Sequence, residues 1–473
     1  MKSVLLHLMI LILSSSAYAQ AQPDGADSLK IQEILTFSQF MELVKNHHPL
    51  AMKANLQTEV GRMEVRNSRG AFDPMAYADV SQKYYKELQY YSHQEGGVII
   101  PTWMGIEFEG GYENNDGQFL NPEQLVPNEG LWWAGISVPL GKDLFIDSRR
   151  AALRQAQLFQ EATEAERTLM LNKILSEAGK TYWKWFSAYY SYQVFDQSID
   201  VVELRFRNTK AGAAVGEDAV IDTVEAKIQL QNRRADFQDA LAKYQNARVQ
   251  LSTFLWQEGV VPLVIRDDIR PPSLDTTEAI DASELRRDSL LVNHPLLRFN
   301  RLQIDQLDID RRLAAEKLKP KLDLKYRALQ PAFETNREVG ILDDNYTWGL
   351  SFSFPIFLRG ERGKLQQIKL KLQQSEFEYA NQEQQLRFQI ESTINLWNAS
   401  AQQVSLYQDA SQNSFTLLQA EQRLFDIGES SVFMINAREL GYIKAQLNWI
   451  KSISTNQISR INTYFQLGRL QNL

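Results

Sequence analysis

The chain has 473 residues, a net charge of −7 and no cysteine. Its length allows about three domains of roughly 150 residues each. The missing cysteines exclude a disulfide framework, a thiolate metal site and a lipid attached to a cysteine, and the mild negative charge without a basic stripe excludes nucleic acid as a partner.

The first 19 residues predict a secretory signal peptide. Lys2 precedes an apolar run over 4–13, and Ala17-Tyr18-Ala19 has the small-x-small pattern of a cleavage site. The alternative, a membrane anchor, is disfavoured because the run has about ten residues where a helical span needs about 20. We therefore expect an exported protein that meets a membrane with strands.

An internal repeat organises the rest of the chain. His48-Pro49-Leu50 recurs 246 positions later as His294-Pro295-Leu296, and Trp185 recurs 212 positions later as Trp397. Each half reads as a helix, a strand region, a very long helix, a glycine turn and a second long helix. A repeat on this scale indicates one elongated body, divided into a first repeat (20–257), a connector rich in proline and acidic residues (258–283) and a second repeat (284–473).

Both strand regions, about 75–140 and 320–355, alternate between two kinds of side chain. One row is apolar and the other is charged or very small, and aromatic residues collect near the strand ends. An ordinary soluble sheet is the alternative, but these features favour the wall of a membrane barrel. The apolar rows are Met104, Ile106, Phe108 and Tyr112; Trp132, Ala134, Ile136 and Val138; Leu322, Leu324 and Tyr326; and Tyr346, Trp348, Leu350, Phe352 and Phe354.

The strand count predicts an oligomer. The sequence offers four convincing strands, or five, whereas membrane barrels need about eight or more and an open edge is costly in lipid. The strand number of the first half stays open. A chain that returns to its starting side needs an even number of membrane crossings, but three segments (75–86, 103–114 and 131–140) look like strands. Either Tyr90–Ile100 hides a further strand or one of the three does not cross. Long loops are expected at 115–129 and 330–345.

The long helices are predicted over 148–213 and 360–426, which contain no proline. The first would be about 95 Å long at 1.5 Å per residue. A shorter helix returns after each glycine turn, over about 219–256 and 431–468, with a composition that suits helices packed side by side. Such lengths exceed a globular domain and fit a tube projecting from a membrane.

Taken together, these features resemble the TolC-like outer-membrane factors. The resemblance covers essentially all of the mature chain and depends on motifs used twice in order: Phe72-Asp73-Pro74, Val138-Pro139-Leu140, Phe354-Pro355-Ile356 and the two glycine turns. It implies a mainly α protein with a membrane β-barrel portion, in which a homotrimer pools twelve strands into an outer-membrane barrel continued by a periplasmic α-barrel. It also implies a passive exit duct of a tripartite efflux pump or type I secretion system, with a periplasmic adaptor and an inner-membrane RND or ABC transporter as partners.

The resemblance places the adaptor-docking tip at the two turns, Val215-Gly216 and Ile427-Gly428. The plainer interpretation, a helix–helix turn with glycine at the C-cap, is compatible with that role. The family's tyrosine/arginine/aspartate latch is largely missing here, while Asp222 would leave an acidic mouth that attracts cations. The expected aperture residues are Glu217, Asp218, Asp222, Phe425, Glu429 and Met434.

We expect no enzyme, cofactor or metal site. His47-His48 lacks further ligands at a suitable spacing and predicts a helix end before Pro49. No acidic pair has an environment that suits acid–base catalysis. The competing hypothesis is a periplasmic helical scaffold without a pore, which outer-membrane fractionation would separate from a duct.

Overall fold

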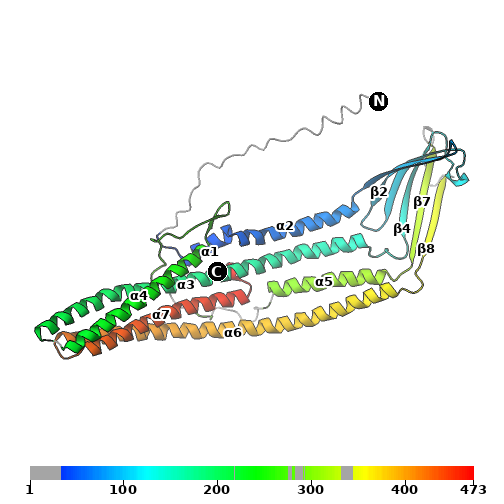
Figure 1. The fold of residues 1–473 in the computed structure, drawn as a ribbon. Coiled ribbons are helices and arrows are strands. Elements are labelled where there is room, and N and C mark those ends of the chain that lie inside the picture. Colours follow the sequence, from blue (N-terminus) through cyan, green and yellow to red (C-terminus); the bar gives the residue numbers. More distant parts are fainter. Residues whose placement is uncertain are drawn as a thin grey trace, which may run out of the picture.

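The protein is elongated, with a β-sheet at one end and two helix-hairpin turns at the other (Figure 1). This computed structural model describes residues 33–217, 219–274, 280–282, 291, 293–331 and 345–472. The expected signal peptide, Asp218 and most of the expected loop at 330–345 lie outside the described residues. In the described part, no helix is long and apolar enough to cross a membrane.

Two helices of 68 residues run almost the full length of the molecule: α3 (Ser148–Val215) and α6 (Arg359–Asp426). The shorter helices α4 (Val220–Ser252) and α7 (Val432–Gln466) return from them. All four agree with the helices predicted from the sequence. At 1.5 Å per residue, each long helix measures about 100 Å.

Near the sheet, α2 (Pro49–Arg69) and α5 (Pro295–Glu316) fill the place that α4 and α7 occupy at the other end. Contacts between neighbours give the lateral order α2, α3, α5, α6 for this four-helix layer. The short helix α1 (Phe37–His47) precedes α2 and packs on α3. The molecule is therefore four helices wide at the level where it meets the sheet.

The repeated His-Pro pair starts a helix in each half. His48 and His294 are the N-caps of α2 and α5, each followed by proline at the first helical position. Their Nδ1 atoms accept hydrogen bonds from Leu50 N and Leu296 N, both at 3.2 Å. His48 also ends α1, as the sequence predicted. A proline there loses no hydrogen bond, because the first helical N–H groups have no partner within the helix.

The main core lies at mid-length, where α1, α3, α7 and the end of α4 meet the connector. Trp185, Tyr182 and Phe186 of α3 are fully buried there. The connector adds β5 (Trp256–Gln257) and β6 (Val261–Pro262), which form a two-stranded sheet. Trp397 occupies the corresponding place in a second, smaller cluster on α6. The repeated tryptophans therefore anchor one cluster in each half.

The main sheet has six antiparallel strands in the order β1-β2-β3-β4-β7-β8. The count of four or five strands was wrong, and the parity question is resolved because residues 88–101 form the missing strand. Residues 102–106 are a turn, so Met104 and Ile106 do not belong to the strand row in which we placed them. The strands are β1 (Met75–Tyr85), β2 (Leu88–Pro101), β3 (Glu107–Asp116), β4 (Leu131–Pro139), β7 (Lys321–Pro331) and β8 (Tyr346–Ser353).

Three short 3₁₀ segments lie wholly within the described residues. They are η1 (Gly70–Phe72), which leads from α2 into β1; η2 (Pro122–Gln124), in the loop between β3 and β4; and η5 (Leu470–Asn472), which follows α7.

Candidate functional site: the helix-hairpin tip

The tip is the end of the molecule formed by the two turns that join α3 to α4 and α6 to α7 (Figure 1). Both turns have the same geometry. In the first, Glu217 N donates to Gly212 O at 2.9 Å and Gly216 N donates to Ala213 O at 3.4 Å. In the second, the same two bonds join Glu429 to Leu424 at 2.8 Å and Gly428 to Phe425 at 3.0 Å. These are paired Schellman motifs.

Glycine is required at both turns by the backbone. Gly216 has φ of 82° and Gly428 has φ of 81°, in the left-handed region that other residues seldom adopt. A β-carbon at either position would meet nothing within 4 Å, so conformation and not space selects the glycine.

Large apolar side chains are exposed around both turns. Val215 is 73% exposed and Ile427, its counterpart in the second half, is 68% exposed. Val220, Ile221 and Phe433 on the returning helices are also exposed. Exposed apolar residues of this size are compatible with the predicted docking role, and the exposed Glu217 and Glu429 directly follow the two glycines.

The other predicted aperture residues lie within a few positions of the two turns. Asp222 lies in the first turn of α4 and is half-buried, as are Phe425 before the second turn and Met434 in α7. Asp218 is outside the described residues. The docking and aperture roles of these residues stay predictions.

A buried ionic cluster that the sequence analysis missed joins the two helix hairpins above the tip. Arg205 of α3 forms an ion pair with Glu439 of α7 at 2.5 Å and donates to Asn436 Oδ1 at 2.7 Å. Arg233 of α4 approaches the other oxygen of Glu439 at 3.5 Å. Burial lowers the pKa of the Arg233 guanidinium, and the Glu439 carboxylate offsets part of that desolvation cost.

A second polar link lies within the α6–α7 hairpin. Ser430 Oγ donates to Glu421 Oε1, and Arg438 Nε contacts Glu421 Oε2 at 3.3 Å. Ser430 follows the second glycine turn by two residues. Ser430 and Arg438 thus both bind the carboxylate of Glu421, which connects the two helices of the hairpin.

The sequence did hold a signal for the ionic cluster. The first five buried residues of α7 lie on one face of the helix: Val432, Ile435, Asn436, Glu439 and Ile443. Two polar residues interrupting an apolar stripe indicate a buried polar contact, because an unpaired charge there is costly. The partners Arg205 and Arg233 lie more than 200 residues away, which no local pattern reveals.

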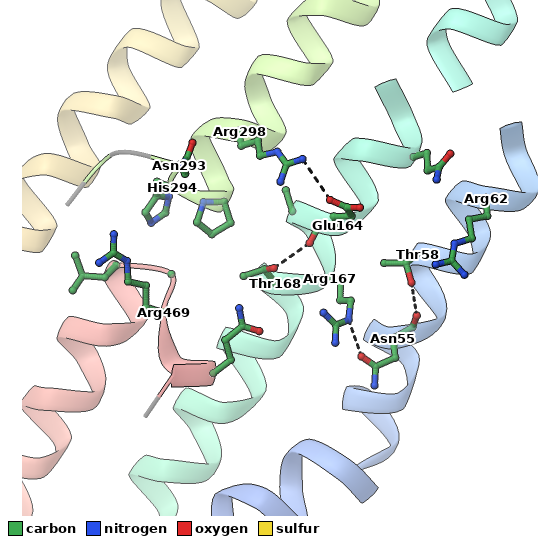
Figure 2. A pocket seen from close by; sticks show the side chains of 16 residues that line it. Asn55, Thr58, Arg62, Glu164, Arg167, Thr168, Asn293, His294, Arg298 and Arg469 are labelled. Atoms are coloured by element: carbon green, nitrogen blue, oxygen red, sulfur yellow. Dashed lines mark hydrogen bonds and ion pairs between the residues drawn. The ribbon is translucent and has the colours of Figure 1, made fainter. Parts of the chain in front are cut away.

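Farther from the tip, a polar pocket of about 730 Å³ lies between α2, α3 and the start of α5 (Figure 2). Arg298 contacts Glu164 at 3.4 Å and Arg167 Nε donates to Asn55 Oδ1 at 2.8 Å. Four arginines and one carboxylate line the pocket, and Arg62 also pairs with Glu59 at 2.5 Å. The arginines that line the pocket are Arg62, Arg167, Arg298 and Arg469.

Comparison with known proteins agrees with this architecture. Residues 287–438 match the family model of the outer membrane efflux protein. No curated protein matches the sequence.

Solved outer-membrane channels share the fold at low sequence identity. The Campylobacter jejuni CmeC channel superposes with a TM-score of 0.61 at 15% identity, over 91% of this chain and 85% of that chain. Vibrio cholerae VceC superposes with a TM-score of 0.63 at 14% identity, over 92% of this chain and 96% of that chain. Neisseria gonorrhoeae MtrE superposes with a TM-score of 0.63 at 15% identity, over 91% of this chain and 88% of that chain. The resemblance expected from the sequence is confirmed: the chain has the fold of TolC-like outer-membrane channels, and its residues 287–438 carry the outer membrane efflux protein signature.

Proposed function

We propose that this chain is one subunit of a trimeric, passive exit duct in the outer membrane, with its helices projecting into the periplasm. The observation that supports this most is that the chain joins two parts end to end. A sheet with one face that carries no charge except Asp116 is continued directly by helices about 100 Å long, and solved outer-membrane channels share this fold.

The uncharged face of the sheet supports contact with lipid. Trp132 is 55% exposed, Trp348 66% and Phe352 69% in the single chain, and these residues would be costly to leave in water. The two outermost strands, β1 and β8, each have one unpaired edge in the described sheet. In a bilayer those edges must pair, because unsatisfied backbone groups cost several kcal/mol each there. Several copies joined edge to edge meet that need.

The tip supports docking of a periplasmic adaptor, with Val215, Gly216, Ile427 and Gly428 at its centre. The adaptor would connect the duct to an inner-membrane transporter of the RND or ABC class, which supplies the energy. In this proposal the signal peptide ends at residue 19, and the repeats at 20–257 and 284–473 with the connector at 258–283 form one body. The duct has no catalytic role and needs no cofactor.

Fractionation of cells that produce the full chain tests the proposal against the helical scaffold. The duct predicts recovery in the outer membrane as a detergent-stable trimer. The control is the same chain with Trp348 and Phe352 both changed to Arg, which should lose membrane insertion because arginine on the lipid face costs about 2–4 kcal/mol at mid-depth. Release of the unaltered chain as a soluble monomer would establish the scaffold instead.

A further inference from the structure

The six-stranded sheet, taken with the proposed trimeric duct, changes the size of the barrel. We infer that three copies of this chain close an 18-stranded barrel (3 × 6 = 18), with β1 of each copy paired to β8 of the next. The inference depends on the proposed function, since it needs three copies in a membrane. The sequence analysis expected twelve strands, which requires that β1 and β2 stay out of the barrel wall.

The first argument is that β1 and β2 keep the same two faces as the other strands. Partners across the sheet place Ala78 beside Gly96, Gly96 beside Tyr112, and Tyr112 beside Trp132. From β1 to β8, no charged residue occupies this row except Asp116 at the end of β3. The row consists of Ala76, Ala78, Val80 and Gln82; Ser92, Gln94, Gly96, Val98 and Ile100; Phe108, Gly110, Tyr112, Asn114 and Asp116; Trp132, Ala134, Ile136 and Val138; Leu322, Leu324, Tyr326, Ala328 and Gln330; and Tyr346, Trp348, Leu350 and Phe352.

The opposite face carries the charge on β1 and β2, as it does on β3 and β7. Tyr77 Oη donates to Glu95 Oε1 at 2.9 Å between β1 and β2. Farther along, Arg327 of β7 reaches Glu109 of β3 at 2.8 Å, over the intervening strand β4. This crossing is possible because β4 has Gly135 there, where a β-carbon would lie 2.7 Å from Arg327 Cγ. One polar face therefore runs from β1 to β7, as in the lumen of a barrel.

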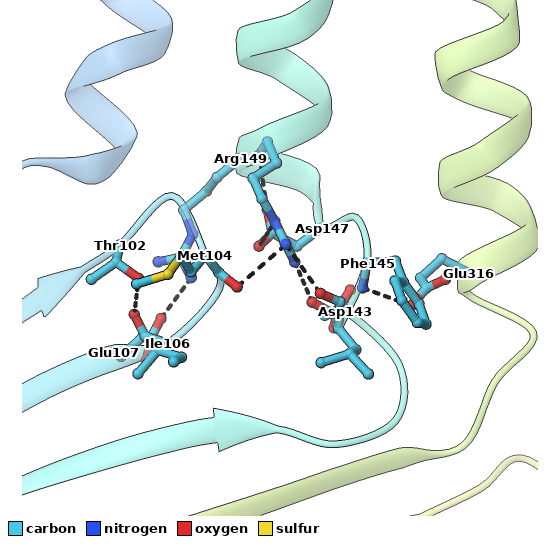
Figure 3. A network of polar contacts seen from close by, with 11 residues as sticks. Thr102, Met104, Ile106, Glu107, Asp143, Phe145, Asp147, Arg149 and Glu316 are labelled. Carbon is cyan, nitrogen blue, oxygen red and sulfur yellow. Dashed lines mark hydrogen bonds and ion pairs between the residues drawn. The ribbon is translucent and has the colours of Figure 1, made fainter.

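The second argument is that the turn between β2 and β3 is built into the joint between sheet and helices (Figure 3). Arg149 at the start of α3 pairs with Glu107 of β3 at 2.7 Å. Its buried neighbour Arg150 donates to Met104 O in the turn at 3.4 Å and to Leu144 O at 3.1 Å.

The backbone of this turn is fitted to the joint as well. Gly105 has φ of 87°, and a β-carbon there would lie 2.9 Å from a guanidinium nitrogen of Arg150. Thr102 Oγ1 closes the turn by donating to Ile106 O at 2.7 Å. β2 and β3 therefore turn at the level where β4 leads into α3, so β1 and β2 lie beside the other strands.

The third argument is width. At a tilt of about 40° and a strand spacing of about 4.8 Å, six strands cover roughly 38 Å of circumference and four strands cover roughly 25 Å. The adjoining layer of α2, α3, α5 and α6 covers roughly 32–40 Å, because packed helices lie 8–10 Å apart. Six strands therefore match the width of the four-helix layer of each copy.

The consequence is a wide lumen. Eighteen strands give a barrel about 36 Å across between backbones, compared with about 24 Å for twelve strands. Barrels of 16 to 18 strands leave an open aqueous channel. We infer that the membrane section of this duct does not limit the size of its cargo.

Paired cysteines test which strand meets β8 of the next copy, and the natural chain contributes no cysteine of its own. One series combines Asp79→Cys on the polar face of β1 with cysteine at Thr347, Gly349 or Ser351 on the polar face of β8. The matched series replaces Asp79→Cys by Glu113→Cys on the polar face of β3. A short bismaleimide applied to outer membranes spans both directly opposite and diagonal neighbours, whose separations are about 5 and 7–8 Å.

The 18-stranded barrel predicts covalent trimers from at least one β1–β8 pair and none from the β3–β8 pairs. Covalent trimers from β3–β8 pairs, or no β1–β8 product from a trimer that is intact on a native gel, would overturn it and leave the duct standing. Absence of any trimer would overturn the proposed function, and this inference with it.

Labelling of single cysteines gives a second measurement that does not need a close pair. Val80→Cys lies on the uncharged face of β1 and Asp79→Cys on the polar face. If β1 is part of the barrel wall, a membrane-impermeant maleimide should label Asp79→Cys at least tenfold faster than Val80→Cys. Equal rates in an intact trimer would show that β1 is outside the wall and would overturn the inference.

Discussion

At the tip, the two halves of the chain build the same turn, with matching hydrogen bonds and glycines of nearly equal φ. At the sheet, the first half supplies four strands and the second half supplies two. The long helices between them are equal, at 68 residues each. The geometry of the helices and turns is thus repeated closely, while the first half carries one more β-hairpin than the second in the described sheet.

The largest expected effect concerns the link between the halves at Glu439. Glu439→Gln removes the ion-pair partner of Arg205 and Arg233, and Arg233 stays buried with only the charge of Asp236 to offset its own. We expect a loss of about 3–5 kcal/mol in the free energy of unfolding, measured by thermal unfolding of the solubilised protein with circular dichroism.

Adjacent arginines provide the control for that cluster. Arg233→Gln should destabilise strongly, whereas Arg234→Gln should change stability by less than about 0.5 kcal/mol, because the Arg234 pair with Glu203 is exposed. If both variants unfold alike, the buried cluster does not hold the two halves together.

The equivalence of the two turns is tested by alanine. Gly216→Ala and Gly428→Ala should each cost about 1–2 kcal/mol, since both impose a β-carbon on a left-handed backbone. Gly441→Ala within α7 is the control and should stabilise by about 0.5–1 kcal/mol, because that glycine is in a helix interior with open space around it. Unequal losses at the two turns would contradict their equivalence.

The two histidine caps should behave alike and respond to acid. His294→Ala should cost about 1 kcal/mol, while His294→Asn retains a capping acceptor and should cost less. The neutral ring is needed because Nδ1 accepts from Leu296 N and Nε2 lies 2.9 Å from Gln466 O, to which it can then donate. Calorimetry of the protein and of both variants measures these losses.

The pH dependence has a definite sign. Burial lowers the pKa of His294 below its ordinary 6.5, and burial also lowers the pKa of His48. The unfolded chain therefore takes up protons first, so the stability from the neutral caps is present above pH 6.5 and is lost as the pH falls through the lowered pKa values. The melting temperature should therefore fall between pH 7.5 and pH 5.5, and it should fall less in His294→Asn. An equal fall in the two proteins, or no fall in either, would contradict this.

The smallest expected effect on stability comes from substitutions at Asp222 and Met434, where the two halves differ. Asp222 occupies the place in the first half that Met434 occupies in the second. Asp222→Asn should leave stability unchanged but lower the preference for cations in planar-bilayer conductance, and Met434→Asp should raise it. Identical conductance and ion preference in all three proteins would exclude an acidic ring at Asp222.

Features set by short-range pattern were predictable from the sequence. The helices α3 and α6 follow from long proline-free stretches, and both turns follow from their glycines. Strand β2 was missed because Val98-Ile99-Ile100 places apolar residues on both faces and Gly96-Gly97 weakens the alternation. The turn at Met104–Ile106 was taken for strand because its apolar residues happen to alternate.

At the candidate site, the turns were predictable and the network above them was not. Gly216 and Gly428 mark the tip through their own backbone requirement. Glu439, Arg205 and Arg233 are brought together only by the packing of two hairpins, over separations that exceed 200 residues. Even so, the α7 side of that contact was predictable, because Asn436 and Glu439 interrupt an apolar stripe.

Helix α3 has a mechanical consequence as a lever. It is one continuous helix, with Arg149 and Arg150 fixed to the joint at one end and Val215 at the tip on the other. Trp185, buried in the core at mid-length, holds the same helix a second time. At 1.5 Å per residue, only about 45 Å of helix extends from that core to the tip, so a bend of about 5° there displaces the tip by about 4 Å. The packing around Trp185 would therefore govern how far the distant tip can move.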